Sequence, residues 1–270
     1  MRPLPIARLS DPRPRVLTTS ALGLAVIVCA WAWHAPAQAQ PAEPHADGGR
    51  WRLGLAISPE VRPYRNFDEG TELMPVIRYE NQWLRVTGPG LEVKLGATGP
   101  VQWGLSLSYA RDGYKPSDSP DLVGMDRRRD SAWAGLRASL PTPYARFNAE
   151  WSADASGHSD GQKLRLTAQR RVDLGTVALT PRVGATWLDS RYTRYYFGVQ
   201  GHEARVLRPS YQPGSTVNTE IGLRLDHTLA PRHQVFADLS VTLLGSAIKN
   251  SPLVDRSSLP HLRVGYQYQF

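Results

Sequence analysis

The last ten residues of the chain alternate strictly between apolar and polar side chains. Leu262, Val264, Tyr266, Tyr268 and Phe270 occupy the even positions, and the odd positions hold polar residues or glycine. Successive side chains of a β-strand point to opposite faces, so this segment predicts one strand with an apolar face and a polar face. About ten residues is also the length of a tilted strand that crosses a bilayer. The segment therefore predicts a strand that can face lipid on one side.

Aromatic side chains crowd the end of that apolar face. Tyr266, Tyr268 and Phe270 lie where a girdle of aromatic rings would meet the lipid headgroups. A chain that ends on Phe after such a strand resembles the C-terminal assembly signal of bacterial outer-membrane β-barrels. We therefore interpret these three residues as a signal for the barrel-assembly machinery, and we predict that the chain resides in the outer membrane, in contact with its lipid.

The N-terminus has the pattern of an export leader. Four arginines among the first fifteen residues precede an apolar run at residues 16–33 and a small-x-small sequence at residues 37–39. This order predicts a cleaved signal peptide at residues 1–39 and an outer-membrane β-barrel domain at residues 40–270. A membrane anchor is disfavoured because the run is short and a cleavage site follows it. The single cysteine, Cys29, lies inside the leader, so the mature chain would form no disulfide.

The same alternation recurs in eleven earlier segments, of which 82–87 is the weakest. They span residues 51–58, 73–79, 82–87, 91–95, 101–109, 134–140, 145–152, 163–169, 179–187, 220–226 and 234–243. The links between them alternate between short and long along nearly the whole chain, and only Gly88, Pro89 and Gly90 make a link too short for its place. Up-and-down barrels sort their connections in this way, with tight turns at the periplasmic rim and longer loops outside.

A soluble β-sandwich would also alternate, but it has no reason to sort its loops by parity. We therefore predict an all-β fold, a transmembrane antiparallel up-and-down β-barrel of twelve strands, with ten strands as the alternative. The last strand is expected to pair with the strand that begins near Trp51.

Charged residues of both signs follow the polar face of these strands and are expected to line the lumen, because a charge on the lipid face would cost about 2–4 kcal/mol near the midplane. They are Arg52, Arg78, Glu92, Lys94, Arg137, Arg146, Glu150, Lys163, Arg165, Arg182, Glu220, Arg224, Asp226 and Arg263. We favour a polar interior that braces the barrel through paired charges. The alternative is a water-filled path with a mild preference for anions, because basic residues outnumber acidic ones.

Two loop segments carry other candidate roles. Arg127, Arg128 and Arg129 are flanked by acidic residues and predict a solvated loop face. The aromatic-rich residues 192–197 predict part of the outer aromatic girdle, in preference to a loop that folds into the lumen. Neither these segments nor the modest positive charge of the mature chain predicts binding to nucleic acid.

Candidate chemistry is weak. His158 lies beside Ser156 and Ser159 and could form a nucleophile–base pair, but neighbours in one glycine-containing loop rarely hold the required geometry. His202 and Glu203 could bind a metal, yet no further ligand lies at a suitable spacing, and zinc sites need three or four ligands. We therefore predict no catalytic residue, no cofactor and no metal site.

Several segments resemble the MipA/OmpV family of outer-membrane proteins, in family order and over almost the whole mature chain. They are Ser58-Pro59 with Tyr64 and Gly70, residues 74–79, Ser156-Gly157-His158 with Gly161, residues 187–189 with Tyr192, residues 195–199, residues 244–247, residues 250–254 and the terminal Tyr268-x-Phe270. The glycine- and aspartate-rich stretch usual in the family after Ser-Pro is altered here, at residues 61–70.

The resemblance implies a non-enzymatic barrel. The best-known member implies a scaffold that links a murein hydrolase, a lytic transglycosylase, to a murein synthase, a bifunctional penicillin-binding protein, at the periplasmic face. Other members imply a porin-like channel for small polar or anionic solutes, or an adhesin. We favour the scaffold and keep the channel as the alternative.

Overall fold

The computed structural model describes residues 49–270 of the chain. The predicted signal peptide, residues 1–39, lies outside the described residues.

The described residues form thirteen β-strands joined in one antiparallel sheet. Their bounds are β1 (Arg50–Pro59), β2 (Thr71–Glu80), β3 (Leu84–Thr87), β4 (Gly90–Thr98), β5 (Val101–Ala110), β6 (Ser131–Pro141), β7 (Arg146–Asp154), β8 (Gln162–Gln169), β9 (Val172–Leu174), β10 (Val177–Leu188), β11 (Thr216–Ala230), β12 (His233–Leu243) and β13 (Ser258–Gln269). The short β9 continues the line of β8, because both pair with β10. The wall therefore has twelve strand positions, as the sequence predicts.

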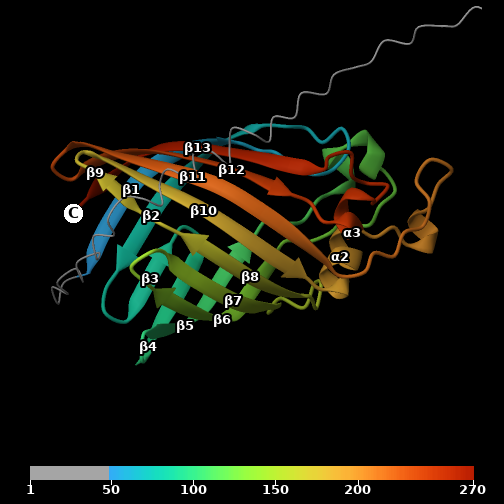
Figure 1. Ribbon diagram of the computed structural model, residues 1–270. Helices are drawn as coiled ribbons and strands as arrows, with labels where there is room; N and C mark the ends of the chain where they lie inside the picture. The colour runs from blue at the N-terminus through green and yellow to red at the C-terminus, as the bar shows by residue number, and fades with distance from the viewer. Residues whose placement is uncertain (1–48) are drawn as a thin grey trace, which may run out of the picture. The chain divides into compact units, whose positions relative to one another are not determined.

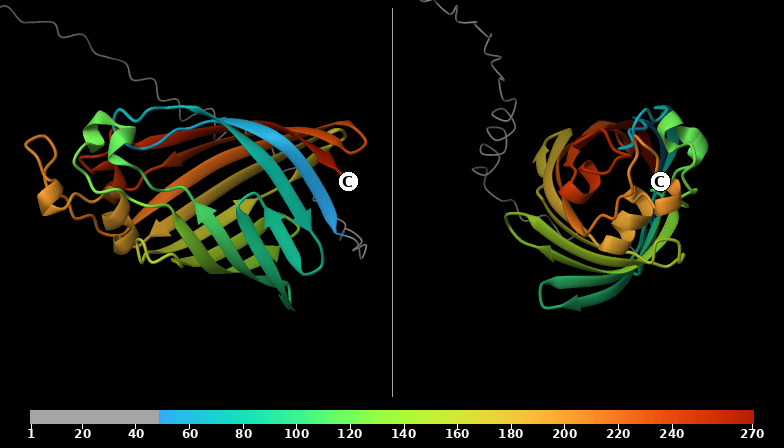
Figure 2. Two further views of the ribbon diagram at one scale, coloured as in Figure 1. Left: turned by 180° about the vertical axis from the view of Figure 1, so that it is seen from behind. Right: turned by 90° about the vertical axis from the view of Figure 1, so that its right-hand side faces the viewer.

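The sheet closes on itself. β13 pairs with β1 in antiparallel register, with Leu53 opposite Tyr268 and Ile57 opposite Val264, and β10 pairs with β11. The backbone N–H of Phe270 donates to the carbonyl of Trp51 at 3.0 Å. The predicted pairing of the last strand with the first is confirmed, and the ring of strands is visible end-on in Figure 2.

Short helical segments gather in the long loops at one end of the barrel (Figure 1). They are η1 (Pro116–Asp118), η2 (Pro120–Leu122), α2 (Ser190–Phe197), η3 (Gly201–Glu203) and α3 (Ser246–Lys249). None of the helices in residues 49–270 is long and apolar enough to cross a membrane. Since long loops mark the external side of such barrels, this end is the external one and the tight turns form the periplasmic rim.

The two faces of the wall differ as the alternation requires. On β5, Leu105 and Leu107 are each 49 % exposed on the outer face, whereas Ser106 between them is 9 % exposed on the inner face. Exposing so many leucine, valine and isoleucine side chains to water would be unfavourable, but in a bilayer they contact acyl chains.

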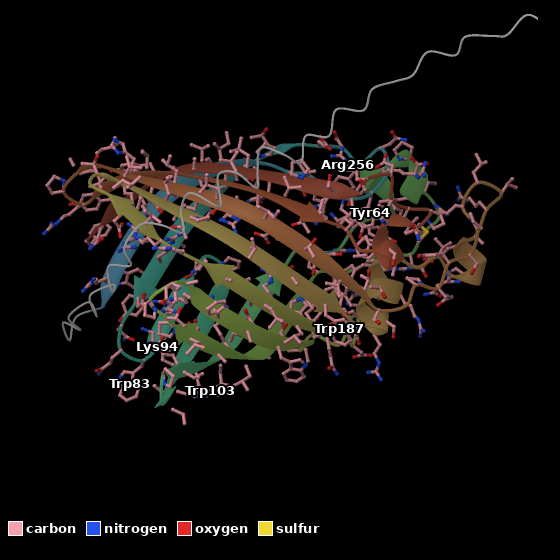
Figure 3. All side chains as sticks on the ribbon, in the orientation of Figure 1. Tyr64, Trp83, Lys94, Trp103, Trp187 and Arg256 are labelled. Carbon is pink, nitrogen blue, oxygen red and sulfur yellow. The ribbon has the colours of Figure 1, made fainter. Side chains whose placement is uncertain are left out.

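Aromatic rings border this apolar band at both ends. Trp83 and Trp103 lie at the periplasmic end and Trp187 lies towards the external end (Figure 3). Tyr109 and Trp151 add exposed rings on the external side. Amphipathic rings at these two levels match the headgroup regions of a membrane, which agrees with an outer-membrane location.

The wall is irregular at β3. This strand has four residues, pairs with only Arg78, Tyr79 and Glu80 of β2, and turns into β4 through Gly88 and Pro89. Gly88 has φ +54, a conformation that favours glycine. The link that broke the loop alternation in the sequence is therefore a turn inside the wall and not an external loop.

Replacement of Leu239 by Arg tests the lipid-facing assignment. Leu239 is exposed in the middle of β12, so a guanidinium there should lower the free energy of unfolding by about 2–4 kcal/mol. Urea unfolding of the barrel in lipid vesicles would measure the loss. As a control, Thr242→Arg places the same charge on the inner face opposite Glu220 and should change the stability much less. Equal losses in the two variants would contradict the assignment.

Candidate functional site: the barrel interior and its external cap

The first ion-pair network of the interior joins five strands through charged groups and one hydroxyl. The carboxylate of Glu92 accepts hydrogen bonds from Arg85 at 3.2 Å and from Arg137 at 2.9 Å. Arg137 also reaches Glu150 at 2.7 Å, and the hydroxyl of Ser106 donates to the same carboxylate at 2.8 Å. This network ties β3, β4, β5, β6 and β7 together across the inner face of the sheet.

The second network lies on β10, β11 and β12. Arg182 contacts Glu220 at 2.7 Å and Asp238 at 2.8 Å. Arg224 pairs with Asp226 at 2.8 Å and lies 3.8 Å from Asp238. Each cation thus faces two carboxylates, an arrangement that offsets the cost of removing the charges from bulk water.

Four of the other predicted lumen residues have other partners, and the partner of Lys94, Glu80, also pairs with Arg85 of the first network. The partners are Glu80 for Lys94, Asp112 for Lys163, Gln269 for Arg52 and His261 for Arg263. The ammonium group of Lys163 also lies 3.8 Å from the ring centre of Trp133 and 4.4 Å from that of Tyr192. The strand pattern thus brought many of the predicted charges into contact.

The last three predicted lumen residues lack an ionic partner among the described residues. Within residues 49–270, the guanidinium groups of Arg78, Arg146 and Arg165 form no ion pair with a carboxylate. Arg165 is also exposed, although its neighbours across the ladder are Glu150 and Thr186.

Sequence reasoning missed several partners in these networks. Asp238 lies on the polar face of the predicted strand 234–243, so the alternation itself could have identified it. Arg85 lies in the weakest candidate strand, where the pattern is short. Asp112 comes from a loop, and no periodicity places a loop residue beside Lys163.

A cavity of about 390 Å³ lies against the first network. Its lining includes Glu92, Arg137 and Glu150 from the network, and Lys163 and Arg165 from β8. Trp133 and Ala110 lie at its external side, at the ends of strands that lead into the loops.

The external loops pack into a hydrophobic core of their own, here called the cap. Its buried members are Tyr64, Tyr114, Leu122, Met125, Trp133, Leu188, Tyr192, Tyr196, Phe197, Val199, Leu244, Ile248, Leu253 and Val254. Four long loops contribute to it, together with residues from the ends of the strands. The helical segments therefore lie over the external end of the barrel and pack against one another (Figure 2).

The prediction that residues 192–197 form part of the outer girdle was wrong. These residues lie in α2, whose N-cap Asp189 accepts a hydrogen bond from the backbone N–H of Tyr192 at 2.9 Å. Tyr192 and Tyr196, one helical turn apart, are both buried in the cap. The alternative, a segment that folds over the lumen, describes α2 better. The composition of the segment suits either place, so packing with the other loops decided it.

The prediction for Arg127, Arg128 and Arg129 was partly wrong. Arg127 and Arg129 are exposed, but Arg128 is 4 % exposed and pairs with the equally buried Glu203 at 2.7 Å. Arg128 also donates to the carbonyl of Tyr195 at 2.6 Å. The partner lies 75 residues further along the chain, so local charge patterning could not reveal this pair.

Asp126, His202 and Glu203 form a group with the spacing of a metal site, which adds a third residue to the predicted pair. The two oxygens of Glu203, however, already accept hydrogen bonds from Arg128 and from the backbone N–H groups of Asp126 and Gln200. His202 contacts Asp126 at 2.9 Å on the exposed surface. The group is better explained as an ion-pair cluster that joins two loops.

The loop around His158 is organised by Asp154. The hydroxyl groups of Ser156 and Ser159 both donate to this carboxylate. The Nδ1 atom of His158 lies 2.7 Å from the carbonyl oxygen of Asp130. Within this loop the described hydrogen bonds thus direct the serines away from the imidazole, and the nucleophile–base contact of a hydrolase is not formed.

The chain is similar in sequence to known outer-membrane proteins. Residues 52–270 match the family model described as MltA-interacting protein MipA. The MltA-interacting protein of Escherichia coli (strain K12) is 26 % identical over 231 residues, which cover 84 % of this chain and 92 % of that protein. Outer membrane protein OmpV of Vibrio cholerae is 29 % identical over 212 residues, covering 78 % and 82 %. An outer membrane channel from Pseudomonas putida F1 aligns with a TM-score of 0.39 and 10 % identity, over 86 % of this chain and all of that one.

Removal of the buried guanidinium should loosen the cap. Arg128→Met leaves Glu203 as a buried charge without its partner, which should destabilise the cap by about 3–5 kcal/mol. Limited proteolysis of whole cells would report faster cleavage in the external loops. The double variant Arg128→Met/Glu203→Gln should recover much of the resistance, and His202→Gln on the exposed surface should have little effect. Unchanged cleavage in Arg128→Met would show that the pair does not hold the cap.

Alkaline pH should also open the cap. Burial raises the pKa of Tyr64 and Tyr192 well above the ordinary value near 10, because the phenolate form is poorly solvated there. A raised folded-state pKa gives stability that is complete below pH about 10 and is lost as the pH rises through the folded value. In a titration followed by absorbance near 295 nm, some tyrosines should therefore ionise only above pH about 10. Proteolytic cleavage of the loops should begin in the same pH range. Simple titration of all tyrosines near pH 10 would contradict this.

Proposed function

The chain belongs to the MltA-interacting protein MipA family, and on that premise we propose that it is a non-enzymatic scaffold that holds a lytic transglycosylase at its periplasmic rim. It is an outer-membrane β-barrel, like the relatives named as outer membrane proteins. The name of the Escherichia coli relative records an interaction with MltA. The resemblance in the sequence adds a murein synthase, a penicillin-binding protein, as the second partner.

The observation that carries this proposal is the packed cap. An open porin needs a continuous water-filled path, whereas here the loops share a buried aromatic core at the external end, and ion pairs line the inner face of the wall. Both features stabilise the barrel as a rigid body. Rigidity favours a platform for proteins, since a preorganised surface loses little entropy when a partner binds.

The periplasmic rim offers the docking surface that the proposal requires. Its connections are short turns, which hold their residues in fixed places. They present the basic residues Arg146, at the start of β7, and Arg232, between β11 and β12. Tyr144, two residues before Arg146, is 74 % exposed, and aromatic and arginine side chains are enriched in protein interfaces.

Charge reversal at the rim tests the scaffold. Arg146→Glu together with Arg232→Glu should reduce the capture of a purified MltA-type lytic transglycosylase about fivefold or more, since each exposed ion pair contributes roughly 0.5 kcal/mol. Capture would be measured with the folded barrel immobilised in detergent. Arg191→Glu, an exposed charge on α2 at the external end, is the matched control and should leave capture unchanged. If the native barrel retains no transglycosylase, the scaffold proposal is wrong.

The second candidate, a channel for small anionic solutes, is favoured by the cavity. Four basic and two acidic side chains line it, and Arg165 forms no ion pair within the described residues. A solute path through this cavity would require the cap to move.

Planar-bilayer conductance separates the two candidates. The scaffold predicts a silent barrel, and Arg128→Met should produce conducting steps because the cap is loosened. Stable single-channel steps from the native protein, with a preference for chloride over potassium, would instead support the channel and count against a pure scaffold.

A further inference from the structure

The wall of the barrel has an unpaired stretch on one edge of β2. The ladder between β2 and β3 covers only Arg78, Tyr79 and Glu80, and the N–H of Gly88 donates to the carbonyl of Ile77 at 2.8 Å. Beyond that bond, residues 71–76 pair with β1 but with no strand on the other side, in the part of the chain that the structure describes. In lipid, an open edge is normally excluded because its polar groups cannot meet water.

The sequence is adapted to this open edge. The carbonyl of Ile77 points towards β3, so with the period of two the backbone groups of Pro75 and Leu73 point the same way. Proline has no N–H, and it is tolerated in a sheet where no ladder partner is required. Glu72, on the inner face, pairs with Arg111 from the second external loop. Because of Pro75, the open edge has one unpaired N–H group fewer. The ion pair of Glu72 with Arg111 lies at its external end.

Two cavities meet at the tip of the β3–β4 hairpin below this edge. One is the interior cavity of about 390 Å³, and the other is an outer groove of about 370 Å³. Both are lined by Gly90, Leu91, Leu107 and Ser108. The groove also contacts Tyr109 on the lipid face. The wall is therefore hollowed from both sides at the place where its ladder is interrupted.

The interior cavity ends on basic side chains. Lys163 is held by Asp112 and by the rings of Trp133 and Tyr192. Arg165 lines the same cavity, is exposed, and forms no ion pair among residues 49–270, although Glu150 lies opposite it in the ladder. A guanidinium of this kind presents a planar fork of donors that matches a carboxylate. The outer groove, in contrast, consists almost entirely of apolar side chains and turn backbone.

We propose that the interrupted wall at the β3–β4 hairpin is a lateral binding site for a long-chain fatty acid taken from the bilayer. The acyl chain occupies the apolar groove and the hairpin tip, and the carboxylate enters the interior cavity and pairs with Arg165. The small volume of the groove fits a single acyl chain, and the groove borders lipid directly. The basic side chains Lys163 and Arg165 in the interior cavity favour an anionic head group. The site does not depend on the scaffold role.

Binding of radiolabelled palmitate to the barrel in phosphatidylcholine nanodiscs tests the proposal, with empty nanodiscs as the partition background. The native barrel should bind palmitate saturably, at about one molecule per barrel. Arg165→Gln should weaken binding about tenfold or more, because it removes a charge-assisted contact. Arg78→Gln removes another inward arginine that has no carboxylate partner among residues 49–270 and does not line the cavity, and it should leave binding unchanged.

Two further variants test the entry route. A Cβ atom at Gly90 would lie at ordinary contact distance from the carbonyl oxygen of Thr87 and from Ser108, so Gly90→Phe should fill the passage and abolish binding. Ala132→Phe fills the outer groove from the lipid face and should weaken binding even if Gly90→Phe fails to fold. Heat-modifiable gel migration verifies that each variant is folded.

The outcomes separate this site from its alternatives. Absence of saturable palmitate binding, or equal binding in folded Arg165→Gln and Ala132→Phe, overturns the proposal. Competition of palmitate by lysophosphatidylglycerol at equal or lower concentration assigns the site to a phospholipid and overturns the fatty acid, whereas weak competition supports it. Capture of the lytic transglycosylase should be unaffected by Ala132→Phe, so failure of the lipid site and failure of the scaffold are distinguishable.

Discussion

The structure depends on the hydrogen-bond ladder that closes β13 onto β1. Acyl chains cannot hydrogen-bond to backbone N–H and C=O groups, so each group in the wall must find its partner on a neighbouring strand. The pairing of Leu53 with Tyr268 and of Ile57 with Val264 removes the two free edges that the open sheet would have. With the ring closed, the outer face is free to carry leucine and valine, and every charge of the strands is left to the interior.

Closure of the barrel encloses the charged side chains of the strands, and enclosed charges are costly unless they are paired. Arginines and carboxylates that cannot face lipid are brought close together, and networks around Glu92 and Asp238 neutralise them in pairs. The external loops add a second core of aromatic rings above these networks, anchored by the buried pair of Arg128 and Glu203. One exception to the closed ladder remains at β2, next to the β3–β4 hairpin tip that lines the interior cavity; the same cavity is lined at β8 by Arg165, which has no carboxylate partner among residues 49–270.

Much of the fold follows from a period of two. The alternation located twelve strands, the loop lengths gave the orientation, and the polar faces identified Glu92, Arg137 and Glu150 before any contact was known. The sequence-based predictions failed where a residue packs against residues that are far from it along the chain. Residues 192–197 have the composition of an interfacial girdle, and only their packing against Tyr64 and Trp133 places them in the cap.

The sequence by itself determined the class of fold and the two faces of each strand, and it favoured twelve strand positions over ten, because side-chain alternation and turn length are local properties. The tertiary structure alone decided which charges pair, how the loops close the external end and where the wall is interrupted. Those features join residues that are far apart in the chain, such as Arg128 with Glu203 and Lys163 with Asp112. Their free energy arises from burial and from distances that no local pattern records.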